Sequence, residues 1–300
     1  MKYPTGQAFL DTPSKHLALI GLSGVGKSTV ARLLPPDDWF TYSVDYRIWT
    51  HYLGDQLNDY LKSLTMSHPI LGDLLRRDAI TVEHRVGFDN LLATSAFMGM
   101  LGNPDKGGST ASEFKLRMAE HARAEVQAML DIPAFIRRSE RLYGYGNFLV
   151  DATGSACEVI ELENLDDPAL RVLEDTCVVV YIEATATHQQ ELIRRAAIYP
   201  KPIYYRPDFI NDNLPSLLAE RNVDSVEDLD PKVVGRYLYP RLLDHRAQRY
   251  AAIAGHIGYT ISMVDILEAK TGQSVLALIA AAIDKSGIND PTTGIARVAN

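Results

Sequence analysis

A glycine-rich turn between two apolar segments is the feature that most restricts how this chain can fold. The segment reads HLALIGLSGVGKSTVARLL, and residues 21–28 match G-x-x-x-x-G-K-[ST] at every fixed position. HLALI predicts a strand and STVARLL predicts a helix, so the glycines fall in a strand–turn–helix unit. Backbone N–H groups of such a turn converge on phosphate oxygens, and the motif therefore predicts a nucleoside-triphosphate site.

The motif gives each group in the turn an expected role. Lys27 is expected to reach the β- and γ-phosphates of ATP, and the Ser28 hydroxyl is expected to bind Mg²⁺. The helix that begins at Lys27 would direct its positive N-terminal end at the same phosphates. The predicted ATP-binding residues are Gly21, Ser23, Gly24, Val25, Gly26, Lys27, Ser28 and Thr29. A glycine turn with a chance lysine is the alternative interpretation, and the flanking strand and helix count against it.

Five short apolar runs bounded by turn residues predict buried strands. The runs are 16–20, 39–44, 147–150, 177–182 and 259–264. Helical patterns separate all five, which favours a parallel sheet covered on both faces. The predicted fold class is therefore α/β, a P-loop NTPase three-layer sandwich with a five-stranded parallel sheet.

The strands are unevenly spaced along the chain. The second and third are separated by about a hundred residues, and a structureless loop of that length is uncommon in a compact domain. We therefore expect a P-loop core of residues 1–45 and 147–285, and a helical insert of residues 46–146. Residues 286–300 are expected to form a loosely held C-terminal tail.

Charge and cysteine content exclude several classes of protein. The formal charge of −8 argues against binding long nucleic acid, which is held mainly by clustered Lys and Arg. The two cysteines form neither a metal-binding spacing nor a disulfide framework, which suits a reducing cytoplasm. The N-terminus lacks the apolar segment of a signal peptide, and the run SVLALIAAAI is too short to span a membrane. We expect a cytoplasmic protein with no membrane partner.

Two carboxylates follow predicted strands. Asp151 ends the run NFLVD, where a P-loop protein holds its Mg²⁺, although Asp at a strand end also caps helices and forms turns. Asp45 follows the second strand, where it could accept a proton from an attacking hydroxyl or orient that hydroxyl toward the γ-phosphate. The alternative for Asp45 is an N-cap of a helix starting at Tyr46. The residues alone leave both alternatives open.

In the order of these motifs, the chain resembles the shikimate-kinase-like small-molecule kinases of the nucleoside-monophosphate-kinase branch. GLSGVGKSTVARLL is similar to the P-loop of that family, and VVVYIEATATHQQELIRRA is similar to its fourth strand and lid-entry helix. LVDATGSA resembles the end of its third strand, YYRPDFI resembles the segment after the lid, and RAQRYAAIA keeps an R-x-x-x-Y-x-x-x-A spacing. The resemblance covers about 15–45, 147–208 and 240–285, and it implies a lid at about 196–236.

The resemblance implies roles for several arginines. Arg206 matches an arginine that contacts an acidic substrate, and Arg117 with Glu120 repeats an R-x-x-E that precedes the third strand. Arg194 and Arg195 fall at the entry to the lid, where an arginine could neutralise the transferring phosphoryl group. For Arg117, an ordinary solvated helix arginine is an equally good interpretation.

The resemblance also has departures that bear on the substrate. YSVD retains the second acid of the family's D-x-D as Asp45, but Ser43 replaces the first, and the insert is large. Shikimate is therefore not the expected substrate. The segment IYPKPIYYRPDF could stack a base or ring and pair an anion, or its prolines and tyrosines could only stiffen a loop.

Together these features predict an ATP- and Mg²⁺-dependent phosphotransferase, a kinase that acts on a hydroxyl of a small anionic or ring-bearing molecule. The alternative is a P-loop ATPase or nucleotide-gated switch whose helical insert binds a protein partner. The residues expected to act are Lys27, Asp45, Arg194 and Arg195 in catalysis, Ser28 and Asp151 toward the metal, and Asp45, Arg117 and Arg206 toward the substrate.

Overall fold

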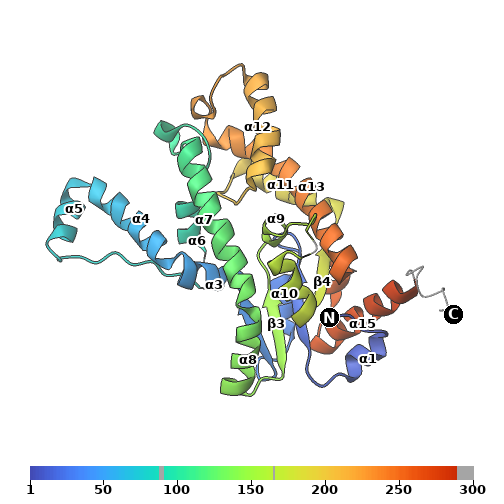
Figure 1. The fold of residues 1–300 in the computed structure, drawn as a ribbon. Coiled ribbons are helices and arrows are strands. Elements are labelled where there is room, and N and C mark those ends of the chain that lie inside the picture. The colour runs from blue at the N-terminus through green and yellow to red at the C-terminus, as the bar shows by residue number, and fades with distance from the viewer. Residues whose placement is uncertain (88–90, 165, 289–300) are drawn as a thin grey trace. The chain divides into compact units, whose positions relative to one another are not determined.

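The computed structural model describes residues 1–87, 91–164 and 166–288 (Figure 1). The predicted α/β class is confirmed, because five strands form a single sheet in the order β2-β3-β1-β4-β5. The strands are β1 (His16–Ile20), β2 (Trp39–Ser43), β3 (Asn147–Asp151), β4 (Val178–Glu183) and β5 (Gly258–Ser262). β1 pairs in parallel with β3 and β4, and β4 pairs in parallel with β5. The range expected for β1 is confirmed, and the other four strands differ from expectation by one or two residues at their ends.

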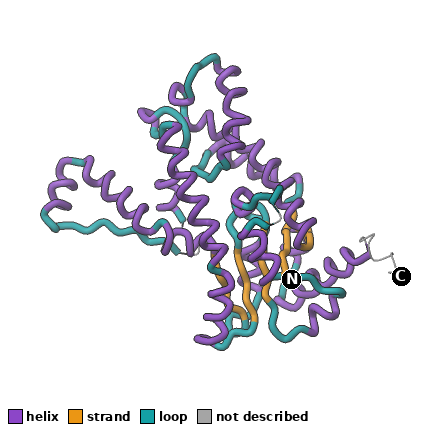
Figure 2. The backbone as a smooth tube through the Cα atoms, in the orientation of Figure 1, coloured by secondary structure: helices purple, strands orange, loops and turns teal. Residues whose placement is uncertain are grey.

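The chain folds into two compact units. Unit 1 contains residues 1–42 and 129–189 and the chain from 245 onward, and it holds the sheet. Unit 2 contains residues 43–128 and 190–244, and it is built mostly from helices, which Figure 2 draws in purple. Residues 46–128 of the expected helical insert and the expected lid at 196–236 therefore fall in unit 2, whereas residues 129–146 of that insert belong to unit 1.

Helices of unit 1 pack on the sheet in two groups. They are α1 (Gly6–Asp11), α2 (Lys27–Leu33), α8 (Ile132–Tyr143), α9 (Ala156–Val159), α10 (Pro168–Thr176), α14 (Met263–Glu268) and α15 (Gly272–Ile288). α15 packs against α1 and α2, whereas α8 packs against α10 and β3. The crossovers from β1 to β2 and from β3 to β4 run in opposite directions along the sheet, so right-handed connections put α2 and α10 on opposite faces. The arrangement is compatible with the predicted three-layer sandwich.

The central strands owe their apolar sequences to this burial on both faces. Every side chain of β1 after His16 is at most 1% exposed, and Phe148, Leu149 and Val150 of β3 are equally buried. Strands covered on both faces read as continuous apolar runs rather than as alternating patterns. This burial is why the sequence predicted the central strands with accurate boundaries.

Unit 2 is helical over most of its length. Its elements are α3 (Val44–Arg47), the π-helix η1 (Ile48–Tyr52), α4 (Gly54–Ser67), α5 (Pro69–Arg76), α6 (Leu92–Met98), the 3₁₀ turns η2 (Pro104–Lys106) and η3 (Val226–Asp228), and α12 (Pro207–Arg221). Three longer helices start in one unit and end in the other: α7 (Ala111–Leu130), α11 (Ala186–Ile198) and α13 (Pro231–Ile257). In η1 the Leu53 N–H donates to the Ile48 carbonyl at 2.8 Å, a bond that spans five residues instead of four.

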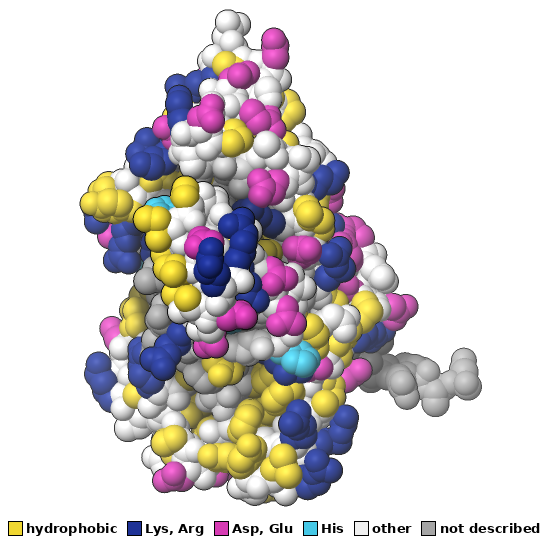
Figure 3. Space-filling model, turned by 90° about the vertical axis from the view of Figure 1, so that its left-hand side faces the viewer, with side chains coloured by type: hydrophobic (Ala, Val, Ile, Leu, Met, Phe, Trp, Pro, Cys, Tyr) yellow, Lys and Arg dark blue, Asp and Glu magenta, His cyan; other side chains and the backbone are white. Residues whose placement is uncertain are grey.

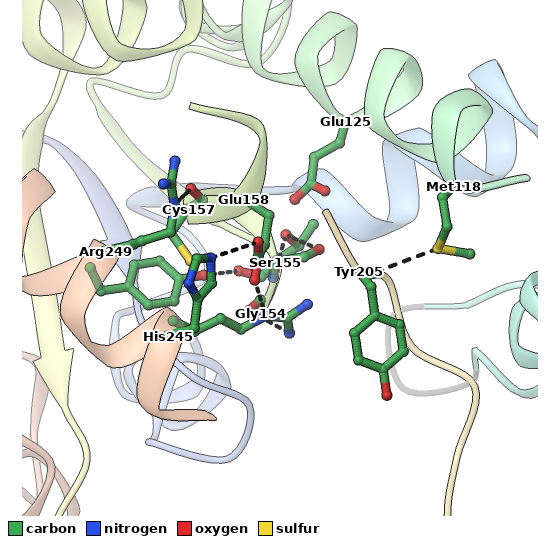
Figure 4. Close-up of polar contacts among 12 residues, drawn as sticks. Met118, Glu125, Gly154, Ser155, Cys157, Glu158, Tyr205, His245 and Arg249 are labelled. Atoms are coloured by element: carbon green, nitrogen blue, oxygen red, sulfur yellow. Dashed lines mark hydrogen bonds and ion pairs between the residues drawn. The ribbon is translucent and has the colours of Figure 1, made fainter. Parts of the chain in front are cut away.

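Segments far apart in sequence share the core of unit 2. The Tyr204 ring stacks on His121 of α7 with 5.1 Å between ring centroids. The Tyr205 N–H donates to the Met118 sulfur at 3.5 Å, a contact drawn in Figure 4. The N-terminal turn of α7 is also held by a distant segment, because the Ala111 N–H donates to a Glu227 carboxylate oxygen at 2.8 Å.

The structure bears on the expected C-terminal tail and on the expectation that no segment spans a membrane. The tail expected at 286–300 begins inside α15, and its residues 289–300 lie outside the described part of the chain. Among the described helices, none has the length and apolar character needed to cross a bilayer.

Candidate functional site

The turn after β1 has a backbone that only glycine adopts readily. Gly21, Gly24 and Gly26 have φ angles of +141°, +79° and +108°. At Gly21 there is a second reason, because a Cβ would stand 2.7 Å from the carbonyl oxygen of Ile182 in β4. The sequence motif therefore corresponds to a turn that is sterically restricted at its fixed glycines.

The Lys27 side chain lies against this turn and hydrogen-bonds to its backbone. Its residue is only 8% exposed, although lysine is rarely buried. The ammonium nitrogen Nζ donates to the carbonyl oxygens of Gly21 at 2.9 Å and of Leu22 at 3.1 Å. The turn thus holds one fixed positive charge against its own backbone, in the position that the motif predicts for a phosphate-binding lysine.

Ser28 and Asp151 lie next to each other because β1 and β3 are paired. Asp151 is opposite Leu19 in the register, and the Ala152 N–H donates to the Leu19 carbonyl at 3.2 Å. This pairing brings the end of β3 beside the turn, where the Ser28 hydroxyl donates to Asp151 Oδ2 at 3.4 Å. The structure therefore brings together the two residues that the sequence assigned to Mg²⁺.

The environment of Asp151 changes its acidity. Burial raises the pKa of the Asp151 carboxyl, and the Lys27 charge and the Ser28 hydrogen bond oppose this rise. The Lys27 ammonium favours the ionised form of this carboxyl group, which is the form that can bind a cation. The donor set is one carboxylate and one hydroxyl, and both are oxygen ligands of the kind that Mg²⁺ takes together with phosphate oxygens.

Two further residues, Gly154 and His188, contact the turn at Ser23, and the sequence analysis identified neither of them. A Cβ at Gly154, in the loop after β3, would stand 2.7 Å from the Ser23 hydroxyl oxygen. From the start of α11, the His188 ring nitrogen Nε2 lies 3.3 Å from the Ser23 carbonyl oxygen. The sequence did contain a signal for the start of this helix, because Thr is a favoured N-cap residue. In the structure the Thr185 hydroxyl accepts a hydrogen bond from the His188 N–H at 3.1 Å.

A buried ion pair contacts the loop that carries Gly154, and Figure 4 labels its carboxylate, Glu158, together with Gly154 and His245. Arg246 Nε donates to Glu158 Oε1 at 2.9 Å, and another guanidinium nitrogen donates to the Gly154 carbonyl at 3.1 Å. His245 Nε2 stands 3.4 Å from the second Glu158 oxygen. The same loop is held by Tyr250, whose hydroxyl donates to the Thr153 carbonyl at 3.1 Å. The R-x-x-x-Y spacing noted in the sequence therefore holds the loop after β3.

The pKa of Glu158 is set by burial and by the neighbouring His245 and Arg246. Burial by itself would raise the pKa of Glu158, but the hydrogen bond from His245 and the charge of Arg246 outweigh it and lower that pKa. The carboxylate is therefore ionised in the folded protein at neutral pH. Burial raises the pKa of the neighbouring Cys157 thiol well above its ordinary range, so that thiol is not a nucleophile.

Asp45 belongs to unit 2 and differs in setting from what the sequence suggested. β2 ends at Ser43, whose hydroxyl accepts the Tyr46 N–H at 3.2 Å and caps α3. Asp45 therefore lies in the first turn of α3 and is not the residue that caps it. A role for Asp45 toward a γ-phosphate stays a prediction.

Arg117 is occupied by contacts inside unit 2. Its guanidinium donates to the Phe97 carbonyl at 2.9 Å and binds the Glu113 carboxylate. The guanidinium carbon also stands 4.8 Å from the centre of the Tyr60 ring. These contacts join α6 and α7, and a substrate role for Arg117 stays a prediction.

The remaining arginines lie at two places in unit 2. Arg194 and Arg195 are 63% and 68% exposed, and their Nε atoms bind Glu191 at 2.7 and 2.8 Å. These bonds lower the pKa of Glu191 to about 2. Arg206 precedes α12, and its Nε is 3.2 Å from an Asp208 carboxylate oxygen. Their predicted roles toward a phosphoryl group or substrate remain open.

The aromatic residues near Arg206 are mainly core residues. Tyr204, Tyr205 and Phe209 are 4–6% exposed, whereas Tyr199 is 76% exposed. Of the two interpretations of this segment, ring stacking with a ligand and local stiffening, the burial of three of the four rings favours the second.

The surface and the comparisons with known proteins add little to identify the site. On the face drawn in Figure 3, acidic and basic side chains are interspersed. No protein-family model, curated protein or solved structure matches this chain.

Proposed function

We propose that the chain is an ATP- and Mg²⁺-dependent phosphotransferase that acts on a hydroxyl group of a small molecule. The observation that carries the proposal is the Lys27 ammonium held inside a glycine turn, 2.9 Å from the Gly21 carbonyl, next to the Ser28–Asp151 pair. Glycines, lysine, hydroxyl and carboxylate are the groups that phosphoryl transfer requires for positioning and charge stabilisation.

Lys27 would act by changing partners. Its bonds to the carbonyls of Gly21 and Leu22 are made to neutral acceptors, and a phosphate oxygen carries negative charge. An ammonium is attracted more strongly to a negatively charged oxygen than to a neutral carbonyl, so a β- or γ-phosphate would compete well for Lys27. The turn itself need not be rebuilt for this exchange.

Ser28 and Asp151 would hold Mg²⁺, which bridges phosphate oxygens and neutralises their charge when bound. The chain's own contribution is to keep a hydroxyl and a carboxylate adjacent, at 3.4 Å, through the pairing of β1 with β3. The Lys27 charge beside Asp151 helps to keep the carboxylate ionised and available.

The acceptor step assigns a role to Asp45. The hydroxyl oxygen of the acceptor would form the new bond to the γ-phosphorus while the bond to the oxygen bridging the β- and γ-phosphorus breaks, and ADP would leave. The hydroxyl proton would pass to the Asp45 carboxylate, which acts as the general base. Arg194 and Arg195 are the candidates to bind the transferring group.

Replacement of Asp45 tests the transfer step separately from nucleotide binding. Asp45→Asn should reduce phosphoryl transfer about a hundredfold, the effect of a lost general base. The affinity for ATP should stay within about threefold of the wild type, a difference under 1 kcal/mol. Calorimetric titration and release of ADP with a panel of hydroxyl acceptors measure the two effects. Asp55→Asn, an exposed carboxylate in the same unit, is the matched control.

The outcomes separate the two functional classes. Loss of transfer with retained affinity supports a kinase. An unchanged rate of ATP hydrolysis that no acceptor stimulates would instead favour a nucleotide-gated switch, in which unit 2 binds a protein partner. A wild-type chain that binds no ATP would contradict both.

A further inference from the structure

We infer that His188 is a positioning residue for the glycine turn, which it holds in the conformation that receives phosphate. The inference rests on the proposed nucleotide site and adds a residue outside its sequence motif. His188 lies in the first turn of α11, and its place there is fixed by the hydrogen bond from its N–H to the Thr185 hydroxyl.

The contact between His188 and the turn has a defined direction. A carbonyl oxygen only accepts hydrogen bonds, so the 3.3 Å contact with Ser23 requires a proton on Nε2 of the ring. His188 is therefore the donor. The same ring lies close to Gly24, where a Cβ would stand 3.3 Å from the ring carbon Cε1.

Peptide geometry converts this contact into control of the neighbouring N–H. In a trans peptide the C=O and N–H groups point in opposite directions. When the Ser23 carbonyl points at His188, the Gly24 N–H points away from His188. Gly24 has a φ of +79°, in the region where glycine adopts many conformations, so this peptide could otherwise rotate.

Ser23 is also contacted by Gly154, in the loop after β3. The Ser23 hydroxyl oxygen lies against Gly154, so closely that a methyl group there would overlap it. Ser23 therefore stands between the loop after β3 and the start of α11. His188 donates a hydrogen bond to the Ser23 carbonyl, and Gly154 packs against the Ser23 hydroxyl. A fixed Gly24 N–H would then be a donor that phosphate meets already oriented.

The test compares His188→Ala with His188→Gln, in binding titrations with ATP·Mg²⁺ and with inorganic tripolyphosphate. His188→Ala should raise the dissociation constants for both ligands by about fivefold, the effect of one ordinary hydrogen bond. Glutamine keeps a side-chain N–H donor, so His188→Gln should stay within about twofold of the wild type. Thr187→Ala, an exposed neighbour in the same helical turn, is the control and should bind as the wild type does.

The two probes separate a contact of His188 with the turn from a contact with the base of the nucleotide. Equal losses for ATP and tripolyphosphate, with rescue by glutamine and an unchanged melting temperature, support the inference. A loss confined to ATP would overturn it, because the ring would then contact the base rather than the turn. Wild-type affinity in His188→Ala would also overturn it. A wild-type chain that binds neither probe would refute the proposed function, and the role of His188 with it.

Discussion

Two buried cations of unit 1, Arg246 and Lys27, are held in different ways. Both residues are 8% exposed. Arg246 is bound to the Glu158 carboxylate at 2.9 Å, and Lys27 donates to the carbonyls of Gly21 and Leu22 at 2.9 and 3.1 Å. Arg246 therefore has a carboxylate as its hydrogen-bond partner, whereas Lys27 hydrogen-bonds to backbone carbonyls and has the Asp151 carboxylate as a charged neighbour. We propose that the first cation is structural and that the second exchanges its carbonyl partners for the oxygens of a ligand.

The largest effect expected from this comparison is on stability at Arg246. Arg246→Ala should lower the free energy of unfolding by about 3–5 kcal/mol, because it leaves the buried Glu158 carboxylate without its arginine. Urea unfolding followed by circular dichroism measures the loss. Arg32→Ala, an exposed arginine in α2, is the control and should change stability by no more than about 0.5 kcal/mol.

A double substitution tests whether the cost comes from the broken pair. Glu158→Leu with Arg246→Met replaces both charges by apolar groups, and it should recover most of the stability lost in Arg246→Ala. If Arg246→Ala loses less than about 1 kcal/mol, the pair is not an architectural element of unit 1.

The next effect concerns ligand affinity at Lys27. Lys27→Ala should weaken binding of ATP·Mg²⁺ by at least about tenfold, or about 1.4 kcal/mol, while the melting temperature stays within about 3 °C. Calorimetric titration and thermal denaturation measure the two quantities. Lys270→Ala, an exposed lysine of the same unit, should leave both unchanged. Wild-type affinity in Lys27→Ala would place Lys27 with Arg246 as a structural cation.

The smallest effect is expected at Asp151, and its sign depends on pH. Burial raises the pKa of Asp151 above its unfolded value, so the ionised carboxylate costs stability at neutral pH, and that cost disappears as the pH falls and the group is protonated. Asp151→Asn should therefore raise the melting temperature by about 2 °C at pH 7, with no gain at about pH 4 or below.

The same variant should lose its response to the metal. In Asp151→Asn, addition of Mg²⁺ should no longer strengthen ATP binding, whereas metal-free ATP should bind as it does to the wild type. Exposed Asp37→Asn is the control for both measurements. A retained Mg²⁺ response, or a lower melting temperature at pH 7, would mean that Asp151 only stabilises the loop after β3.

Much of unit 1 could be predicted from the sequence because its signals are local. The central strands are continuous apolar runs, and the turn is recognisable from its glycines, since they occupy backbone conformations that other residues avoid. The adjacency of Ser28 and Asp151 also followed, because the carboxyl ends of neighbouring parallel strands meet at one edge of a sheet.

The missed elements depend on contacts between distant segments. Nothing local pairs Glu158 with Arg246, although a single acid within the apolar run ACEVI was a signal that a buried charge needs a partner. The alternative in which Asp45 caps a helix starting at Tyr46 is wrong, because Ser43 takes the cap and α3 starts two residues earlier. Within the expected helical insert, the apolar segment 85–101 contains α6, and residues 88–90 of that segment lie outside the described part of the chain.

The π-helix η1 has a consequence for the history of unit 2. A turn of this kind holds one residue more than an α-helical turn, so removal of one residue between Ile48 and Tyr52 would convert it to an α-helical turn. The extra residue is accommodated within the turn itself, so such a deletion would leave the segments on either side of η1 facing as they do now. Leu57 of α4, which is fully buried, would keep its place in the core. A lineage could therefore gain or lose one residue at this turn without changing the apolar pattern of α4.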